Sequence, residues 1–259
     1  MDAAHIITEV RSLLAGDPVY MAGSLVAAET YDKPDAFSDA DLFCPSDQVL
    51  IATVQKLLCN GYTFADRFER VWARWLKYGF KKWHTNSMRM FSPAGYEVNV
   101  IYKLVDGHPT TSLAQVLESF DFGLLATGYD LERDIFMDMR EYLFPGQDPK
   151  GALPMMPNKQ ANWRNGFISQ YNGLREAGRY AKYHGYGYDL SLVKDDLVTG
   201  YWSAASYMAS TFDDEKHLLG QIYSTIAEKI EDGAIDELIE SYKTLDFNDP
   251  LDAIMESLE

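Results

Sequence analysis

The apolar segments change character once along the chain, near residue 150, and this change constrains the fold more than any other feature. Before it, short apolar runs typical of strands alternate with amphipathic patterns typical of helices. After it the pattern is helical alone, and one apolar stripe recurs every fourth residue, at Leu218, Ile222, Ile226 and Ile230. An α/β (α+β) domain followed by a helical domain is therefore expected. The Pro- and Gly-rich stretch 144–157 is the expected boundary, which gives domains at residues 1–150 and 151–259.

Within the first part, the patterns predict a series of short strands and helices. Strands are expected at residues 19–22, 39–44, 88–91, 96–102 and 120–127, and helices at 6–14, 47–59 and 112–119. The turn Ser92-Pro93-Ala94-Gly95 separates two of the strands, which predicts a hairpin there. Strands and helices mixed in this order favour a sheet with helices packed on it.

Composition excludes several classes of protein. The chain has 259 residues, of which 47% are hydrophobic, and its net charge is −16. That charge repels phosphates, so any nucleic acid or triphosphate must meet a local basic patch. Two cysteines, Cys44 and Cys59, are too few for a disulfide framework or a structural zinc site, and they suit a reducing cytosol. The sequence has no secretory signal pattern and no apolar stretch of about 18 residues, so a cytoplasmic protein without membrane contact is expected.

Two short motifs carry the chemistry: Gly23-Ser24, and Asp39-Ala40-Asp41 after a loop. On a strand, residues two apart point to the same side, so Asp39 and Asp41 would present two carboxylates together. Such a pair is stabilised by a divalent cation, and magnesium keeps positions open for phosphates. A Gly-Ser turn that opens a helix offers N–H groups and a hydroxyl to a phosphate. Taken singly, either motif could be an ordinary turn or a solvent-exposed strand, but their order and spacing favour a phosphoryl-transfer site.

Gly23-Ser24, followed by Ser38-Asp39-Ala40-Asp41-Leu42-Phe43, resembles the signature of the DNA polymerase β-like nucleotidyltransferase superfamily. The likeness covers about the first 130 residues. It implies a mixed sheet, two magnesium ions, and transfer of a nucleoside monophosphate from a nucleoside triphosphate to an acceptor. Gly23 and Ser24 would cradle the triphosphate, and Asp39 and Asp41 would be metal ligands. The segment Arg179–Tyr183, before Gly185-Tyr186, is similar to an element of nucleotidyltransferase-like proteins from phages and large viruses.

The resemblance also implies a third acid on a later strand, and two residues compete for this place. Glu97 lies on the expected strand, where Asn99 on the same face would be a neutral replacement. Asp121 comes one strand later, between two phenylalanines, where burying an acid is costly without a partner. Asp121 is the first choice as catalytic residue and metal ligand, and Glu97 the second. The alternative for Asp121 is that it braces a neighbouring loop.

Basic residues gather in two places. Arg67, Arg70 and Arg74 form a helical stripe interleaved with aromatic side chains, and Lys81 and Lys82 follow. This arrangement suits a phosphate backbone with stacked bases, so these five residues are candidate acceptor-binding residues. The alternative is a solvated helix face. Arg179 and Lys182, on one face of a later helix, are candidate nucleotide-binding residues, or they could pair with acids near the C-terminus.

Two hypotheses follow for the function. The first is an enzyme that transfers a nucleotide to a hydroxyl of an RNA, a small molecule or a protein. The second is a non-catalytic relative that binds a nucleotide or a partner protein, which the doubtful third acid and the acidic second half favour. The sequence does not indicate the nucleotide, the acceptor or the oligomeric state.

Overall fold

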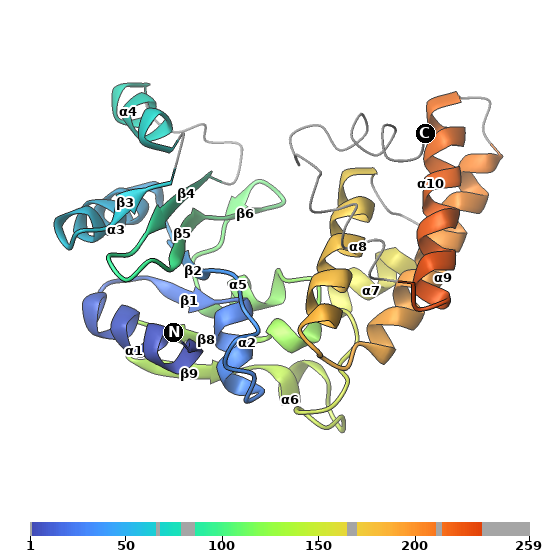
Figure 1. The fold of residues 1–259 in the computed structure, drawn as a ribbon, viewed down its shortest axis with the longest axis horizontal. Coiled ribbons are helices and arrows are strands. Elements are labelled where there is room, and N and C mark those ends of the chain that lie inside the picture. Colours follow the sequence, from blue (N-terminus) through green and yellow to red (C-terminus); the bar gives the residue numbers. More distant parts are fainter. Residues whose placement is uncertain (1, 66–67, 79–85, 165–169, 211–213, 235–259) are drawn as a thin grey trace. The chain divides into compact units, whose positions relative to one another are not determined.

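The structure, a computed structural model, describes residues 2–65, 68–78, 86–164, 170–210 and 214–234. It divides into two compact units (Figure 1). The first unit comprises Met1–Phe120 and Leu124–Pro145, and the second comprises Asp121–Gly123 and Gly146–Glu259. The sequence placed all of residues 1–150 in one domain, whereas in the structure the segment Asp121–Gly123 groups with the later unit.

The core of the first unit is a mixed seven-stranded sheet in the order β3-β4-β5-β2-β1-β8-β9. Its strands are β1 (Tyr20–Ala22), β2 (Ala40–Phe43), β3 (Thr63–Phe64), β4 (Asn86–Phe91), β5 (Glu97–Tyr102), β8 (Thr127–Asp130) and β9 (Ile135–Asp138). Strands β2 and β5 run parallel, and the other neighbours are antiparallel. A separate small hairpin joins β6 (Leu104–Val105) to β7 (His108–Pro109). The mixed sheet that the resemblance implied is therefore present.

Helices pack on this sheet, and local sequence explains where several of them begin. The helices of this unit are α1 (Ala3–Leu13), α2 (Ser24–Thr30), α3 (Asp47–Cys59), α4 (Phe68–Tyr78), α5 (Leu113–Glu118) and α6 (Arg140–Leu143). Asp2, Ser46 and Ser112 cap the first turns of α1, α3 and α5 by accepting backbone N–H groups. Helix α2 contacts β1, β2 and β8, while α5 contacts β1 and β8. Every residue of β1 and β8 is buried, as expected for the centre of a covered sheet.

The strand expected at 120–127 is wrong. This stretch holds a 3-10 helix at Gly123–Leu125, and the strand begins only at Thr127. The reason is that the preceding residues pair elsewhere: Phe122 forms a bridge with Met155, and the Gly123 N–H donates to the Pro154 carbonyl. The apolar run is therefore divided: Phe122 is buried in the second unit, whereas Leu124 and Leu125 are buried in the first, before the strand begins.

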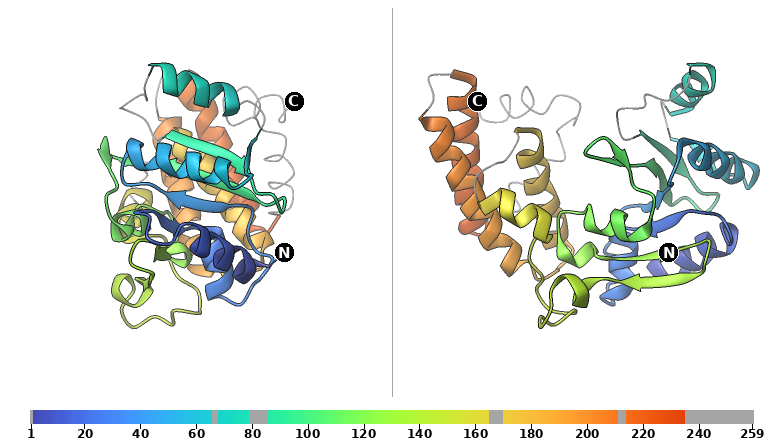
Figure 2. Two further views of the ribbon diagram at one scale, coloured as in Figure 1. Left: turned by 90° about the vertical axis from the view of Figure 1, so that its left-hand side faces the viewer. Right: turned by 180° about the vertical axis from the view of Figure 1, so that it is seen from behind.

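The second unit is helical, as expected. It contains α7 (Pro157–Arg164), α8 (Gln170–Gly185), α9 (Ser191–Ala209) and α10 (Asp214–Glu231). Helices α9 and α10 lie side by side (Figure 2). The rings of Tyr201 and Tyr223 pack between them, with their centres 5.5 Å apart. Ile222, Ile226 and Ile230 are buried, which confirms the apolar stripe at these positions, while the side chain of Leu218 lies outside the described residues. Among the described residues, no helix has the length and apolar character to cross a bilayer.

Candidate functional site

The two motifs meet at the centre of the sheet. Ala22, the last residue of β1, is the antiparallel partner of Asp41 on β2, so Gly23 follows directly beside that carboxylate. Gly23 has φ +94°, and a Cβ built on it would lie 2.7 Å from Asp41 Oδ2. Only glycine combines this backbone conformation with so close an approach. The Gly-Ser turn and the acidic strand are therefore one structural feature.

The carboxylates of Asp39 and Asp41 are both half-buried. Asp41 lies within β2, and its Oδ1 accepts a hydrogen bond of 3.2 Å from Asn99 Nδ2. Asp39 immediately precedes the strand, and its Oδ1 accepts from the Ser38 hydroxyl at 2.5 Å. Ser38, which belongs to the motif but had no assigned role, thus orients one of the two candidate ligands.

Ser24 begins α2 with an unsatisfied polar group. Its side chain is 1% exposed, and within the described ranges its hydroxyl has no hydrogen-bond partner. Buried hydroxyls are normally hydrogen-bonded, so an orphaned one needs an explanation. A ligand oxygen beside Gly23 would supply the missing partner.

The third acid is where the structure departs from the expected pattern. Parallel pairing of β2 with β5 places Asn99, a neutral amide, opposite Asp41. Glu97 lies one residue before the partner of Ala40, and its carboxylate forms an ion pair of 3.0 Å with Arg89. The neutral replacement that the sequence raised as an alternative is thus the residue in contact with Asp41.

Asp121, the other candidate, is held in the second unit. Its side chain is nearly buried and forms an ion pair with Arg179 and another, of 3.6 Å, with Lys159. Buried Glu176 also approaches Arg179, at 3.4 Å. The structure therefore brings together two residues predicted for different roles, Asp121 for metal and Arg179 for nucleotide, as partners of each other. These contacts favour a bracing role for Asp121.

The number of carboxylate ligands limits how many magnesium ions a site can hold. Across the residues that the structure describes, no three or more His, Cys, Asp or Glu side chains gather closely enough to hold an ion. Asp39 and Asp41 are two carboxylates, the number that would suffice for one magnesium ion, since magnesium is commonly held by one or two carboxylates together with substrate phosphates. The two-ion arrangement needs a further carboxylate, and it stays a prediction.

The other basic and aromatic candidates are distributed as follows. Arg70 and Arg74 are exposed on α4, whereas Trp72 is buried, so the basic face and the aromatic face are separate. Arg67, Lys81 and Lys82 lie outside the described residues. In the second unit, Lys182 Nζ lies 5.6 Å from the centre of the Tyr183 ring and 5.9 Å from that of Tyr186. The neighbouring tyrosines Tyr180, Tyr183 and Tyr188 are buried, which assigns them to packing.

Replacing Asp121 with asparagine tests the bracing role. Loss of its charge leaves Arg179 and Lys159 without this carboxylate, and both are about one-third exposed, so solvent screens part of the loss. We expect the free energy of unfolding, measured in urea, to fall by about 1–3 kcal/mol. Asp195→Asn, at an exposed position of α9, is the matched control and should change it little. Unchanged stability together with lost magnesium-dependent nucleotide binding would instead make Asp121 a metal ligand.

No protein-family model and no curated protein matches this sequence. Solved structures similar to the chain include the Thermotoga maritima CCA-adding enzyme complexed with tRNA, at 11% identity and a TM-score of 0.43, over 87% of this chain and 52% of that one. Another is a CCA-adding enzyme in complex with CTP, at 12% identity and a TM-score of 0.43, over 93% of this chain and 72% of that one. The chain thus spans about half the length of the first. Likeness at this level says nothing about individual residues.

Proposed function

We propose that the chain is a magnesium-dependent nucleotidyltransferase, which moves a nucleoside monophosphate from a nucleoside triphosphate to a hydroxyl acceptor. One observation carries the proposal: the backbone of Gly23 lies against the Asp41 carboxylate, and the buried, unpartnered hydroxyl of Ser24 is the next residue. A phosphate placed beside this turn would accept a hydrogen bond from Ser24 and share a cation with Asp41.

Each residue would have a distinct task in the reaction. Asp39 and Asp41 would hold a magnesium ion, which neutralises phosphate charge. Ser38 keeps Asp39 oriented, and Asn99 keeps Asp41 oriented. The reaction joins the acceptor oxygen to the α-phosphorus and releases pyrophosphate and a proton. Because the ground and transition states differ mainly in charge distribution, this positioning is the protein's main contribution.

The acceptor and the second nucleotide contact are proposed from charge alone. Exposed Arg70 and Arg74, with Arg67, Lys81 and Lys82, are the proposed contacts to an RNA, small-molecule or protein acceptor. Arg179 and Lys182 are proposed to contact the nucleotide, although Asp121 and Glu176 already neutralise Arg179.

A second function is favoured by the position of Asn99. An amide opposite Asp41 leaves one carboxylate fewer than the resemblance implies, so the site would bind a magnesium nucleotide without turning it over. In that case the chain would be a nucleotide-binding protein and not an enzyme. Pyrophosphate release distinguishes the two functions.

The test uses each nucleoside triphosphate in turn, labelled at the α-phosphate, with magnesium and with total RNA, a pool of small hydroxyl compounds, or the chain itself as acceptor. We expect label transfer and pyrophosphate release in equal amounts. Asp41→Asn and Asp39→Asn should each lower the rate by on the order of 100-fold or more, because charge neutralisation at the phosphates is lost.

Asp35→Asn provides the control, since Asp35 is an exposed acid in the loop just before the motif. Its rate should match that of the wild type. Magnesium-dependent nucleotide binding without pyrophosphate release would support the second function. If the wild type bound triphosphate equally well in excess chelator, the site assignment itself would be wrong.

A further inference from the structure

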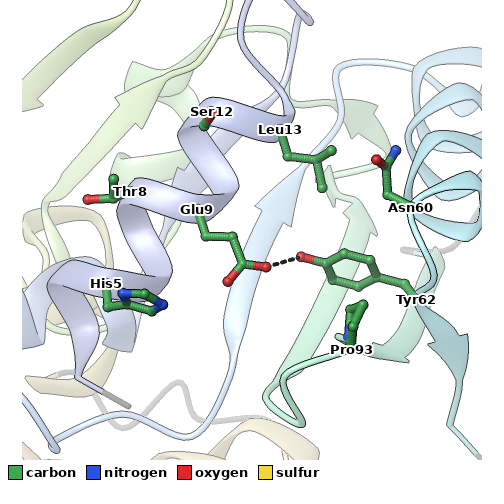
Figure 3. A pocket seen from close by; sticks show the side chains of 8 residues that line it. All are labelled: His5, Thr8, Glu9, Ser12, Leu13, Asn60, Tyr62 and Pro93. Carbon is green, nitrogen blue, oxygen red and sulfur yellow. Dashed lines mark hydrogen bonds between the residues drawn. The ribbon is translucent and has the colours of Figure 1, made fainter.

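A pocket of about 600 Å³ lies in the first unit (Figure 3). Three segments far apart in the sequence form it: α1, the stretch after α3 that contains Asn60 and Tyr62, and the turn between β4 and β5 at Pro93. It contains none of the residues proposed for nucleotidyl transfer. Its polar groups therefore need a separate explanation.

The main polar group of the pocket is the carboxylate of Glu9. Its Oε1 accepts a hydrogen bond of 3.0 Å from the Tyr96 hydroxyl and a longer one, of 3.4 Å, from Tyr62. The two hydroxyls are themselves 2.7 Å apart. Burial raises the pKa of both phenols. For Tyr96 the hydrogen bond with Tyr62 raises the pKa further, so both phenols remain protonated. Glu9 Oε2 has no hydrogen-bond partner among the residues that the structure describes.

Four other polar side chains line the pocket: Thr8 and Asn60, which each donate a hydrogen bond within the protein, and His5 and Ser12, whose side chains donate none among the described residues. The Thr8 hydroxyl donates to the Ala4 carbonyl at 2.8 Å, which leaves its lone pairs available. The Asn60 amide nitrogen donates to the Lys56 carbonyl at 2.8 Å, and Figure 3 shows its oxygen on the side of Leu13. The pocket thus presents the Glu9 carboxylate and several neutral acceptors, together with the His5 imidazole and the Ser12 hydroxyl, which can accept or donate.

The remaining surface is apolar or aromatic. Leu13, Pro93 and the ring of Tyr62 line the pocket, and no lysine or arginine does. A cation with several N–H donors satisfies a carboxylate and neutral acceptors at once, and charge-assisted hydrogen bonds of this kind are the strong ones. An aromatic wall adds attraction for a cation, and a net charge of −16 draws cations toward the chain.

We propose that this pocket binds the cationic head group of a small organic molecule, an ammonium or guanidinium on a short apolar stem. The Glu9 carboxylate pairs with the head group, Asn60 and Thr8 accept further hydrogen bonds, and Leu13 and Pro93 contact the stem. The site is independent of the proposed nucleotidyl transfer, so failure of one leaves the other intact.

The experiment compares two probes of nearly the same shape by calorimetric titration of the full chain. n-Butylguanidinium carries the charge, and N-butylurea replaces the charged head group with a neutral one. We expect the guanidinium to bind with a Kd on the order of 1 mM, as suits so small a ligand. The urea should bind at least about tenfold more weakly, because its hydrogen bonds are not charge-assisted. Equal affinities, or no binding of the guanidinium at about 10 mM, would overturn the proposal.

Two variants assign the binding to this pocket. Glu9→Gln keeps an oxygen for Tyr96 but removes the charge, and it should weaken guanidinium binding at least about tenfold. Ser12→Tyr, at an exposed position of α1 on the pocket wall, should block binding while leaving Tyr62, Tyr96 and Glu9 unchanged in sequence. Glu132→Gln, at an exposed acid elsewhere in the first unit, is the control and should bind as the wild type does. Full binding by a folded Ser12→Tyr variant would contradict the assignment, even if Glu9→Gln failed to fold.

Discussion

Replacing Gly23 with alanine should disable nucleotide binding and destabilise the first unit together. Gly23 has φ +94° and ψ −156°, a backbone conformation that essentially only glycine adopts, and it costs a residue with a Cβ about 1–3 kcal/mol. The added carbon would also lie 2.7 Å from Asp41 Oδ2, and relieving such a contact costs about 1–3 kcal/mol more. We therefore expect the free energy of unfolding in urea to fall by about 2–6 kcal/mol. Magnesium-dependent triphosphate binding should be lost because the Asp41 carboxylate must move.

Gly16→Ala separates the two contributions. Gly16 has φ +80°, and a Cβ there would meet nothing within 4 Å. This variant should show the backbone cost of about 1–2 kcal/mol and keep its affinity for the triphosphate. If Gly23→Ala behaved like Gly16→Ala in both measurements, the close approach to Asp41 would have no functional weight.

Asn99→Asp should make the stability of the chain depend on magnesium more strongly than that of the wild type does. In the absence of the ion, a second carboxylate replaces the amide that donates to Asp41, and repulsion should lower the free energy of unfolding by about 1–3 kcal/mol. Magnesium at about 100 times its Kd should restore about 2.7 kcal/mol, since it binds only the folded chain. Thermal unfolding with and without magnesium measures both effects.

The same variant distinguishes the two proposed functions. If the wild type lacks turnover because Asn99 stands in place of an acid, Asn99→Asp should release pyrophosphate at a rate at least about tenfold higher. Asn99→Ser, which removes the donor without adding charge, is the control: it should lose stability, and magnesium should stabilise it no more than it stabilises the wild type. A wild type that is fully active, with an Asn99→Asp variant that is slower, would show that the amide belongs to a working site.

The local part of the site could be predicted from the sequence. Gly23 follows an apolar strand, and Asp41 lies on the next one, so their meeting depends only on two neighbouring strands pairing in register. The helical spacing of Arg70 and Arg74 likewise predicted one basic face, but the burial of Trp72 agrees with the alternative of a solvated helix face and not with an aromatic side chain that stacks on bases. Short-range periodicity determines which side chains share a face, and this information is contained in a few consecutive residues.

The third acid could not be predicted, because it depends on long-range pairing. Whether Glu97 or Asn99 lies opposite Asp41 is decided by the register of β2 against β5. Both side chains are on the same face of β5, so a register shift of two residues would exchange them. Asp121 was correctly recognised as an acid that needs a partner, but Arg179, which supplies it, comes from a helix of the second unit. Likewise, Glu9 and Tyr96 are 87 residues apart in the sequence, and no helix or strand periodicity connects residues so far apart.

Asp121–Gly123 belongs to the second unit, and this affects how the chain folds during synthesis and where it can be cut into fragments. A fragment that ended at Pro145 would keep Phe122 but lack Tyr183, whose ring meets it edge-on at 6.0 Å. During synthesis Phe122 emerges about 60 residues before Tyr183, so a nascent chain carries an apolar side chain that has no place to pack. Chaperones bind exposed apolar surfaces of this kind. We expect Phe122 to become buried when the full-length chain is synthesised, and not when two separately produced halves are mixed.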